Sequence, residues 1–512
     1  MDRTTDRRTI DHRTVVMTEP TGASDPPPTW EAPRPGHWRR DFRLGEWLAD
    51  PVTPLFATWF LPEAEAGFDD AIFDYWGARM ALPLHVIVNG WYYTNPGRMA
   101  TPVRTTLRHP VRLFRWGFAF ATIVSHPERG ERAMAVPAAA HYESTLLPAY
   151  RSAVDAATAT VGEASPAELV TLVDQVAHAA GGLLLPLAEV LGFASKAELS
   201  LAAFHRKHLS GIGSGGHQPL LAGLGEARTP SNHAVTSIDW SQPTLGELDV
   251  APAPPSHSAH ATLVATRREA ETACRHALAD QSDLLAAFEL RLDLAQRYAV
   301  VREDMADELT IGWPVLRQAL HRLGEHLVAA DALDEVDDVY FCEHDEVVEA
   351  ATGGRTRNLR PAVATRREQW QHQRSLDAPL AMGKLTAPMR RSAELREQFR
   401  SNAITDDHLL VGVPGSPGRA TGPARVVLGP DDFDRVEPGD VLVAPMTTPA
   451  WTPIFGLVAG IVTDTGSVIA HASMVAREYG IPAVVGTGSA TRNLVDGTVI
   501  TVDGDRGVVD LP

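Results

Sequence analysis

The fold of the C-terminal part of this chain can be predicted from one stretch, Thr463-Asp-Thr-Gly-Ser-Val-Ile-Ala-His471-Ala-Ser-Met-Val-Ala-Arg477-Glu-Tyr-Gly480-Ile-Pro-Ala-Val-Val-Gly486. The apolar positions between 458 and 463 predict the end of a buried strand, and Gly466-Ser467 predicts a tight loop. Residues 471–479 then predict a short helix that ends at Gly480, and residues 481–485 predict the next strand. This order of elements places His471 at or just before the first turn of the helix.

His471 is the candidate functional residue of this stretch. The first turn of a helix has free backbone N–H groups and the positive end of the helix dipole, which favour an anion. An imidazole that accepts a phosphoryl group becomes such an anion. Most histidines at helix starts are caps or surface residues, so the prediction depends on the surrounding string as well as on the histidine.

Several motifs around His471 resemble the phosphohistidine, or swivelling, domain of the phosphoenolpyruvate-utilising enzymes. They are the stretch quoted above, Val411-Gly-Val-Pro-Gly-Ser-Pro-Gly418, Gly422-Pro-Ala-Arg-Val-Val427, Gly439-Asp-Val-Leu-Val-Ala444 and Thr448-Pro-Ala-Trp-Thr-Pro453. The Trp-Thr-Pro element and the Arg-Glu-Tyr-Gly-Ile-Pro run look most like the rifampicin phosphotransferase branch. In this family, the histidine that matches His471 takes a phosphoryl group from a nucleotide-binding domain and carries it to an acceptor.

The resemblance implies a phosphohistidine loop around His471, made of Thr463, Gly466, Ser467, Ser473 and Arg477. Two positions depart from the family pattern: Ala470 replaces the usual Ser or Thr, and Ser467 replaces the usual second glycine. Loss of the hydroxyl at position 470 is expected to alter the stability or reactivity of the phosphoryl group. Arg477 lies nearly two helical turns after His471, so we expect it to dock against a partner protein or the substrate domain.

The pattern of apolar residues along the chain changes near residue 405. Helical periodicity dominates from about Trp30 to Arg400, and short Val/Ile-rich strands separated by Gly, Pro and Asp follow from Leu409. Helices are expected at 166–191, 196–209, 282–303 and 314–327, with the breaker Pro186 near the end of the first. We therefore predict a multidomain α plus α/β fold. It has a disordered tail at 1–29, a large, mostly helical acceptor-binding domain at 30–400 and a small α/β swivelling phosphohistidine domain at 405–512.

The helical part also resembles the acceptor-binding middle domain of rifampicin phosphotransferase-like proteins, through Val88-Asn-Gly-Trp-Tyr-Tyr93 and Tyr298-Ala-Val-Val-Arg302-Glu-Asp304. We expect Arg302 to meet the incoming phosphate and Glu303 or Asp304 to take the hydroxyl proton. An ordinary salt-bridged helix face is the alternative for this cluster. An aromatic acceptor pocket or simple core packing are the two interpretations of Asn89, Trp91 and Tyr92.

Composition limits the classes of partner. The chain has 512 residues, 44% of them hydrophobic, and its net charge of −18 argues against nucleic acid or an anionic membrane. No apolar run approaches the ~20 residues of a membrane-spanning helix. Cys274 and Cys342 lie far apart, which fits a reduced, cytoplasmic protein. Histidine pairs at helical spacing lack a third ligand, so solvated side chains instead of a metal site are predicted at His205, His208, His257 and His260.

The resemblance also determines the predicted activity. Rifampicin phosphotransferases and phosphoenolpyruvate synthases begin with an ATP-grasp-like nucleotide domain, for which this chain has no room ahead of Trp38. By resemblance, ATP and Mg²⁺ are expected on a separate nucleotide-binding subunit, as in the split phenylphosphate synthases. The predicted function is a dikinase-type phosphotransferase, in which His471 passes a phosphoryl group to a hydroxyl of a small molecule while ATP yields AMP and phosphate. The alternative is a non-catalytic phospho-relay or small-molecule-binding protein of the same fold.

Overall fold

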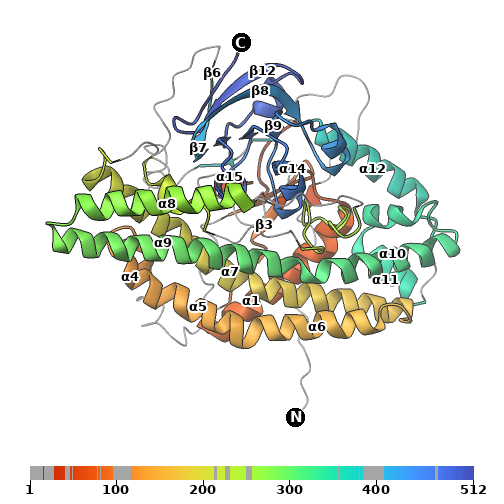
Figure 1. Cartoon of the computed structure of the whole chain (residues 1–512). Coiled ribbons are helices and arrows are strands. Elements are labelled where there is room, and N and C mark those ends of the chain that lie inside the picture. Colours follow the sequence, from red (N-terminus) through yellow and green to blue (C-terminus); the bar gives the residue numbers. More distant parts are fainter. Residues whose placement is uncertain are drawn as a thin grey trace.

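Long helices form the larger part of the computed structural model, and a smaller α/β unit lies on one side of them (Figure 1). The structure describes residues 15–16, 28–40, 47–48, 50–77, 79–80, 82–95, 117–212, 216–224, 231–248, 257–353, 357–376, 378–379, 381–384, 409–466 and 471–512. The helices of the larger part are α1 (Leu61–Trp76), α4 (Pro127–Gly130), α5 (Val136–His141), α6 (Leu147–Thr160), α7 (Pro166–His208), α8 (His257–Ala277), α9 (Ser282–Leu309), α10 (Trp313–Ala329), α11 (His344–Ala351) and α12 (Arg360–Arg374). α9 and α10 include the two later helices that the periodicity predicts, and Pro314 stands in the first turn of α10.

α7 is a single helix of 43 residues, whereas the sequence predicted two helices on either side of residues 192–195. Pro186 removes one backbone hydrogen bond, yet the helix continues because close packing supports it on both sides. A Cβ added to Gly181 would lie 2.2 Å from the carbonyl oxygen of Ala64, and one added to Gly67 would lie 1.9 Å from that of His178. The backbones of α1 and α7 therefore touch at glycines, and this contact overrides the local breaker.

α7 is also long and apolar enough, by length and composition alone, to cross a membrane. No apolar run of this length was predicted from the sequence. Within the protein, 67% of its most apolar window is buried. Packing against α1 and α9 thus explains the apolar character of α7, as in the core helix of a soluble protein.

A five-stranded sheet, with four strands from the first hundred residues and one from residues 381–382, was not predicted. Its order is β1-β3-β4-β2-β5, with β1 at Val15–Val16, β2 at Trp38–Arg39, β3 at His85–Val88, β4 at Trp91–Thr94 and β5 at Ala381–Met382. Strands of two to four residues are too short to show a clear alternating pattern, which explains why the sequence reading missed them. β1 falls inside the predicted disordered tail and pairs with β3; most of that tail lies outside the described residues.

An eight-stranded sheet forms the C-terminal α/β unit, and its order is β6-β13-β12-β8-β9-β10-β11-β7. The strands are β6 (Leu409–Val411), β7 (Val413–Ser416), β8 (Arg419–Val426), β9 (Val441–Ala444), β10 (Gly460–Thr463), β11 (Ala483–Val485), β12 (Val499–Asp503) and β13 (Val508–Asp510). Its helices are α14 (Thr452–Phe455), α15 (His471–Tyr479) and α16 (Ala490–Asn493). β8 to β11 run parallel, and β9, β10 and β11 are buried throughout, as expected for strands covered on both faces. An α/β unit thus follows a mostly helical region, as predicted.

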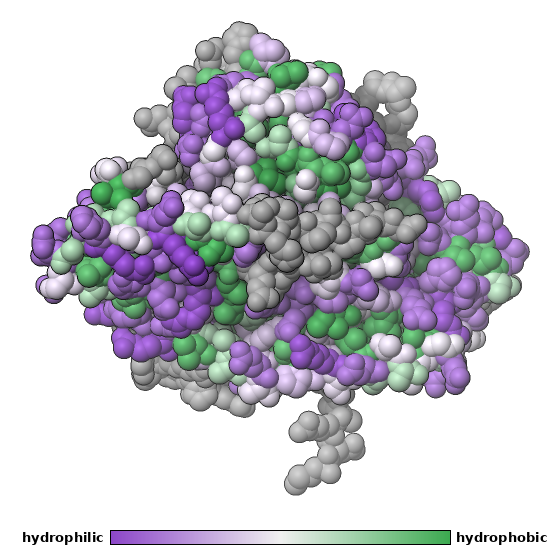
Figure 2. All heavy atoms as spheres, in the orientation of Figure 1, coloured by the Kyte–Doolittle hydropathy of each residue, from purple (hydrophilic) through white to green (hydrophobic). Residues whose placement is uncertain are grey.

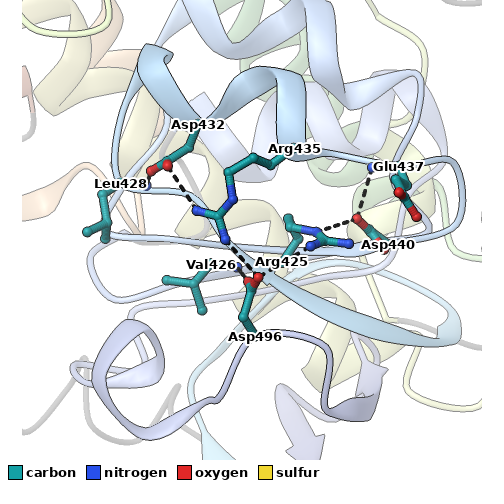
Figure 3. Close-up of polar contacts among 8 residues, drawn as sticks. All are labelled: Arg425, Val426, Leu428, Asp432, Arg435, Glu437, Asp440 and Asp496. Atoms are coloured by element: carbon teal, nitrogen blue, oxygen red, sulfur yellow. Dashed lines mark hydrogen bonds and ion pairs between the residues drawn. The ribbon is translucent and has the colours of Figure 1, made fainter.

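A network of ion pairs joins β8 to the segments that precede its neighbours β9 and β12 (Figure 3). Arg425 of β8 pairs with Asp440 at 2.8 Å and with Asp496 at 3.3 Å, and Arg435 pairs with Asp496 at 2.7 Å. Asp496 also accepts the backbone N–H of Val426 at 2.7 Å.

Figure 2 shows hydrophobic residues gathered on the α/β unit near α14, whereas hydrophilic residues dominate the outer ends of the helices on this face.

Candidate functional site

The helix that carries the candidate phosphohistidine is confirmed, since α15 begins at His471 and ends at Tyr479. Gly480 follows in a left-handed conformation (φ +68°), and Gly466 before the helix also has a positive φ of +144°. Residues 467–470, and with them the predicted loop positions Ser467 and Ala470, lie outside the described residues. The backbone of His471 thus stands at a helix start, where free N–H groups favour a bound anion.

Strand β7 packs against α15. Ser473 is fully buried, and a Cβ added to Gly415 would lie 2.8 Å from its hydroxyl oxygen. Arg477 donates through Nε to the carbonyl oxygen of Gly415 at 2.8 Å. The buried Thr463, at the end of β10, donates its hydroxyl to the carbonyl oxygen of Thr465 at 2.7 Å. Of the predicted loop residues, Thr463, Ser473 and Arg477 therefore fix the loop and helix through side chains.

α15 is docked on the helical part of the chain. Arg477 reaches Glu198 of α7 at 3.3 Å, and Glu198 also lies 3.4 Å from His217 Nε2. Arg302 of α9 contacts the sulfur of Met474, which follows His471 by three residues. α15 also contacts α8, beside which it lies in Figure 1.

The ion pair between Arg477 and Glu198 is buried on both sides, at 3% and 6% residue exposure. Burial alone would raise the pKa of Glu198, but the positive charges of Arg477, His217 and Arg302 outweigh it, so the pKa is lowered. Glu198 is therefore held as a carboxylate within the contact. The sequence left open whether Arg477 docks against a partner protein or against the substrate domain. In the structure, Arg477 contacts the helical part of the chain.

Arg302 and Glu303 lie at the same contact. Arg302 is buried and donates to Glu303 Oε1 from Nε at 3.1 Å and from Nη2 at 2.8 Å. Asp304 is the next residue of α9 and is half-buried. An exposed salt-bridged helix face does not describe this pair, because Arg302 is enclosed by α15. The structure thus brings two predicted acceptor-site residues to the helix that begins with His471.

Asn89, Trp91 and Tyr92 lie in the β3–β4 hairpin. Asn89 and Gly90 form its turn with φ of +48° and +80°, the conformation that an Asn-Gly pair favours. Trp91 donates to the carbonyl oxygen of Gln373 in α12 at 3.1 Å, and Tyr92 stacks on His85. These contacts are those of core packing and lie on other elements than the contacts of Arg302, so an acceptor pocket at the hairpin stays a prediction.

A second contact joins the two parts of the chain at the Trp-Thr-Pro element. Thr448 donates its hydroxyl to the carbonyl oxygen of Val235 at 2.6 Å. Ala450 packs with Ala234 and Leu245 in a small buried apolar cluster. Residues 231–248 therefore form a second docking surface for the C-terminal unit.

Glu198 was not predicted as a site residue from the sequence, and His205 was predicted to be solvated. Glu198 stands beside Ala197 and Leu201 on the apolar face of α7, and a carboxylate at such a position was the available signal. The prediction of a solvated His205 is wrong, because the residue is only 5% exposed. Burial, with the nearby charge of His217, lowers its pKa. Within the part of the chain that the structure describes, no three His, Cys, Asp or Glu residues are grouped to hold a metal ion.

One part of the chain matches a protein family, and longer parts are similar to curated proteins. The family described as PEP-utilising enzyme, mobile domain, matches residues 436–507, which include α15. A rifampicin phosphotransferase of Streptomyces sp. is 31% identical over 385 residues, covering 69% of this chain and 42% of the relative. The uncharacterized phosphotransferase YvkC of Bacillus subtilis is 37% identical over 192 residues, covering 37% and 23%. The phosphoenolpyruvate synthase of Aeropyrum pernix is 53% identical over 109 residues, covering 21% and 13%.

The chain spans less than half the length of each of these curated relatives. The strongest identity, 53%, falls on the shortest alignment, and the longest alignment reaches well beyond the matched mobile domain. Residues 436–507 therefore carry the mobile domain of the PEP-utilising enzyme family, and the longer aligned part of the chain is similar to rifampicin phosphotransferases.

Proposed function

We propose that this chain is the phosphohistidine-bearing and acceptor-binding component of a dikinase-type phosphotransferase. His471 accepts a phosphoryl group from a nucleotide-binding partner and transfers it to a hydroxyl of a small molecule. The observation that carries the proposal is the contact of Met474 in α15 with Arg302 of the helical part, which Glu303 holds in place. A helix that presents a phosphoryl group at its start would bring that group to this surface.

In the first half-reaction, ATP phosphorylates His471 and yields AMP and phosphate. We assign ATP and Mg²⁺ to a separate nucleotide-binding protein. The relatives named rifampicin phosphotransferase are longer than the aligned part of this chain, which leaves room in them for a nucleotide-binding part. Free, buried Cys274 and Cys342 are compatible with a cytoplasmic protein that uses ATP.

The second half-reaction takes place at the docked surface. Phosphoryl transfer has a loose transition state, so the protein mainly supplies alignment, positive charge and a base for the acceptor proton. Arg302 supplies the positive charge beside α15, and Glu303 fixes the plane of its guanidinium by two hydrogen bonds. Arg477 anchors the helix from its other end through Glu198.

α15 must leave this surface to reach the nucleotide-binding protein. Beside the small apolar cluster around Ala450, polar contacts hold the C-terminal unit, among them the Arg477–Glu198 pair, the Thr448–Val235 hydrogen bond and that of Gln218 with the carbonyl oxygen of Pro414. Polar contacts of this kind can be exchanged for water when the units separate. Such an interface suits a domain that docks and departs in each cycle.

Rifampicin is the first acceptor to test, because several relatives are named rifampicin phosphotransferase. The first experiment uses ATP labelled in the β-phosphate, this chain, and the separately produced nucleotide-binding part of such a relative. We expect an acid-labile label on the native chain and none on His471→Ala. The chain without any partner should stay unlabelled.

Two results would contradict the proposal. Labelling of the chain by ATP alone would exclude the separate nucleotide-binding protein. A partner that binds both ATP and this chain, yet labels neither native chain nor variant, would favour the non-catalytic relay or binding protein.

A further inference from the structure

A polar stripe on α9 leads away from the docking point of α15. Glu303, Asp307 and Thr310 are spaced by four and three residues, so they share one face of the helix and its last turn. At one end, Glu303 holds Arg302, which contacts Met474. At the other end, Asp307 and Thr310 meet two side chains from the segment 231–248.

His233 and Ser231 are these two side chains. Ser231 donates its hydroxyl to Asp307 Oδ1 in a short hydrogen bond. His233 Nδ1 lies 3.1 Å from the hydroxyl oxygen of Thr310, and its Nε2 lies 4.0 Å from Asp307 Oδ2. The two residues after His233 touch the C-terminal unit, through Ala450 and Thr448. His233 therefore directly precedes two residues on which the phosphohistidine unit docks.

The hydrogen bonds favour a proton on Nδ1 of His233. The Thr310 hydroxyl lies 3.1 Å from the carbonyl oxygen of Asp307, to which it donates its one proton. In this arrangement Thr310 accepts from Nδ1–H of His233. The neutral ring consequently has its lone pair on Nε2, which has no hydrogen-bond partner among the described residues.

The surroundings suit a base that is neutral at rest and charged after proton uptake. Burial lowers the pKa of His233, and the carboxylates of Asp307 and Glu308 offset only part of this effect. The ring is therefore neutral near pH 7, and its side chain keeps 22% exposure. Once Nε2 takes a proton, Asp307 lies beside the new positive charge, and Ser231 holds that carboxylate in place.

We propose that His233 is the catalytic base that takes the proton of the acceptor hydroxyl when the phosphoryl group leaves His471. This inference rests on the function proposed above. The inference assigns the role of base to His233 instead of Glu303 or Asp304. Glu303 Oε1 already accepts two hydrogen bonds from Arg302. Glu303 is then a positioning residue for that guanidinium.

Transfer to the acceptor exchanges a phosphorus–nitrogen bond for a phosphorus–oxygen bond. The bond between phosphorus and the His471 ring nitrogen breaks, and its electron pair stays on the nitrogen while a phosphorus–oxygen bond forms to the acceptor. The hydroxyl proton moves to Nε2 of His233. The His471 ring departs as a neutral imidazole because its second nitrogen carries a proton, and His233 returns its proton to solvent when the units separate.

The test separates loading of His471 from its discharge. The intact chain is loaded chemically with phosphoramidate, a small phosphoryl donor, and the phosphate on His471 is quantified by mass spectrometry. Discharge is then followed with rifampicin and with water alone. The variant is His233→Asn, whose amide N–H can replace Nδ1–H toward Thr310 but which has no group at Nε2. The control is His321→Asn, at a histidine with a 55% exposed side chain on α10.

We expect equal loading of all three proteins and discharge from His233→Asn that is about 10²- to 10⁴-fold slower than from the native chain. Equal discharge from the native chain and His233→Asn, with every acceptor including water, overturns the inference. Native discharge no faster than that of free phosphohistidine, even with rifampicin, instead overturns the proposed function and with it the inference. ¹⁵N NMR of the native chain gives an independent check: a neutral His233 with its proton on Nε2 also overturns the inference.

Discussion

At the scale of single residues, the buried pair of Arg477 and Glu198 carries the contact between the two parts of the chain. Arg477→Met would leave Glu198 with His217 and Arg302 as its remaining cations. Breaking a buried ion pair on one side costs about 3–5 kcal/mol, so we expect a loss approaching that range in urea unfolding. The double variant Glu198→Gln with Arg477→Met should recover much of the loss, and an unchanged single variant would contradict the prediction.

The same glutamate predicts an acid-sensitive contact. The pKa of Glu198 is lowered from its ordinary 4.5, so its carboxylate stabilises the folded, docked chain above about pH 4.5. That contribution is lost as the pH falls through the lower value in the folded protein. We expect the unfolding free energy of the native chain to fall more steeply below pH 4.5 than that of Glu198→Gln. Parallel curves for the two proteins would show that Glu198 is not charged in the contact.

At the scale of elements, the packing of α1 on α7 depends on glycine. Gly181→Ala would place a methyl group 2.2 Å from the carbonyl oxygen of Ala64. Overpacking of this kind costs about 1–3 kcal/mol or more, because backbone must move. Gly192→Ala in the same helix is the matched control, since its Cβ would meet nothing closer than 4.0 Å. There we expect a gain of up to about 1 kcal/mol from helix propensity, measured by the same unfolding experiment.

Local patterns predicted some elements well. α15, β10 and β11 stand where the glycines and apolar runs place them, and α9 and α10 follow from their periodicity. The break predicted at residues 192–195 is wrong, because α7 runs without interruption from Pro166 to His208 and packs on α1, which is far away in sequence. The five-stranded sheet was missed because its strands have few residues and pair across long separations.

The candidate site was predictable only in pieces. His471 and Arg302 stand in recognisable strings, but the contact between α15 and α9 joins Met474 to a residue 172 positions away. No pattern in one sequence gives such a pairing, and the same holds for His233 with Thr310. These residues come together only through the packing of whole helices and strands.

At the scale of the whole molecule, docking of the C-terminal unit should matter for one half-reaction alone. Ala450 is fully buried against Ala234 and Leu245, so Ala450→Glu would put a charge into that cluster. The variant should still be labelled at His471 by ATP and the nucleotide-binding partner, because that step uses the undocked unit. Transfer to the acceptor should fall at least about tenfold, since an unpaired buried charge costs well over 1.4 kcal/mol.

The control for this variant is Val495→Glu, at a residue of the same unit that is 71% exposed, where both half-reactions should stay as in the native chain. A parallel loss of labelling and transfer in Ala450→Glu would show damage to the unit itself, and circular dichroism would detect it. Unchanged transfer would mean that phosphoryl delivery uses a different arrangement from the docked one. Loss of transfer with labelling intact would tie the chemistry to the surface formed by α9, residues 231–248 and α15.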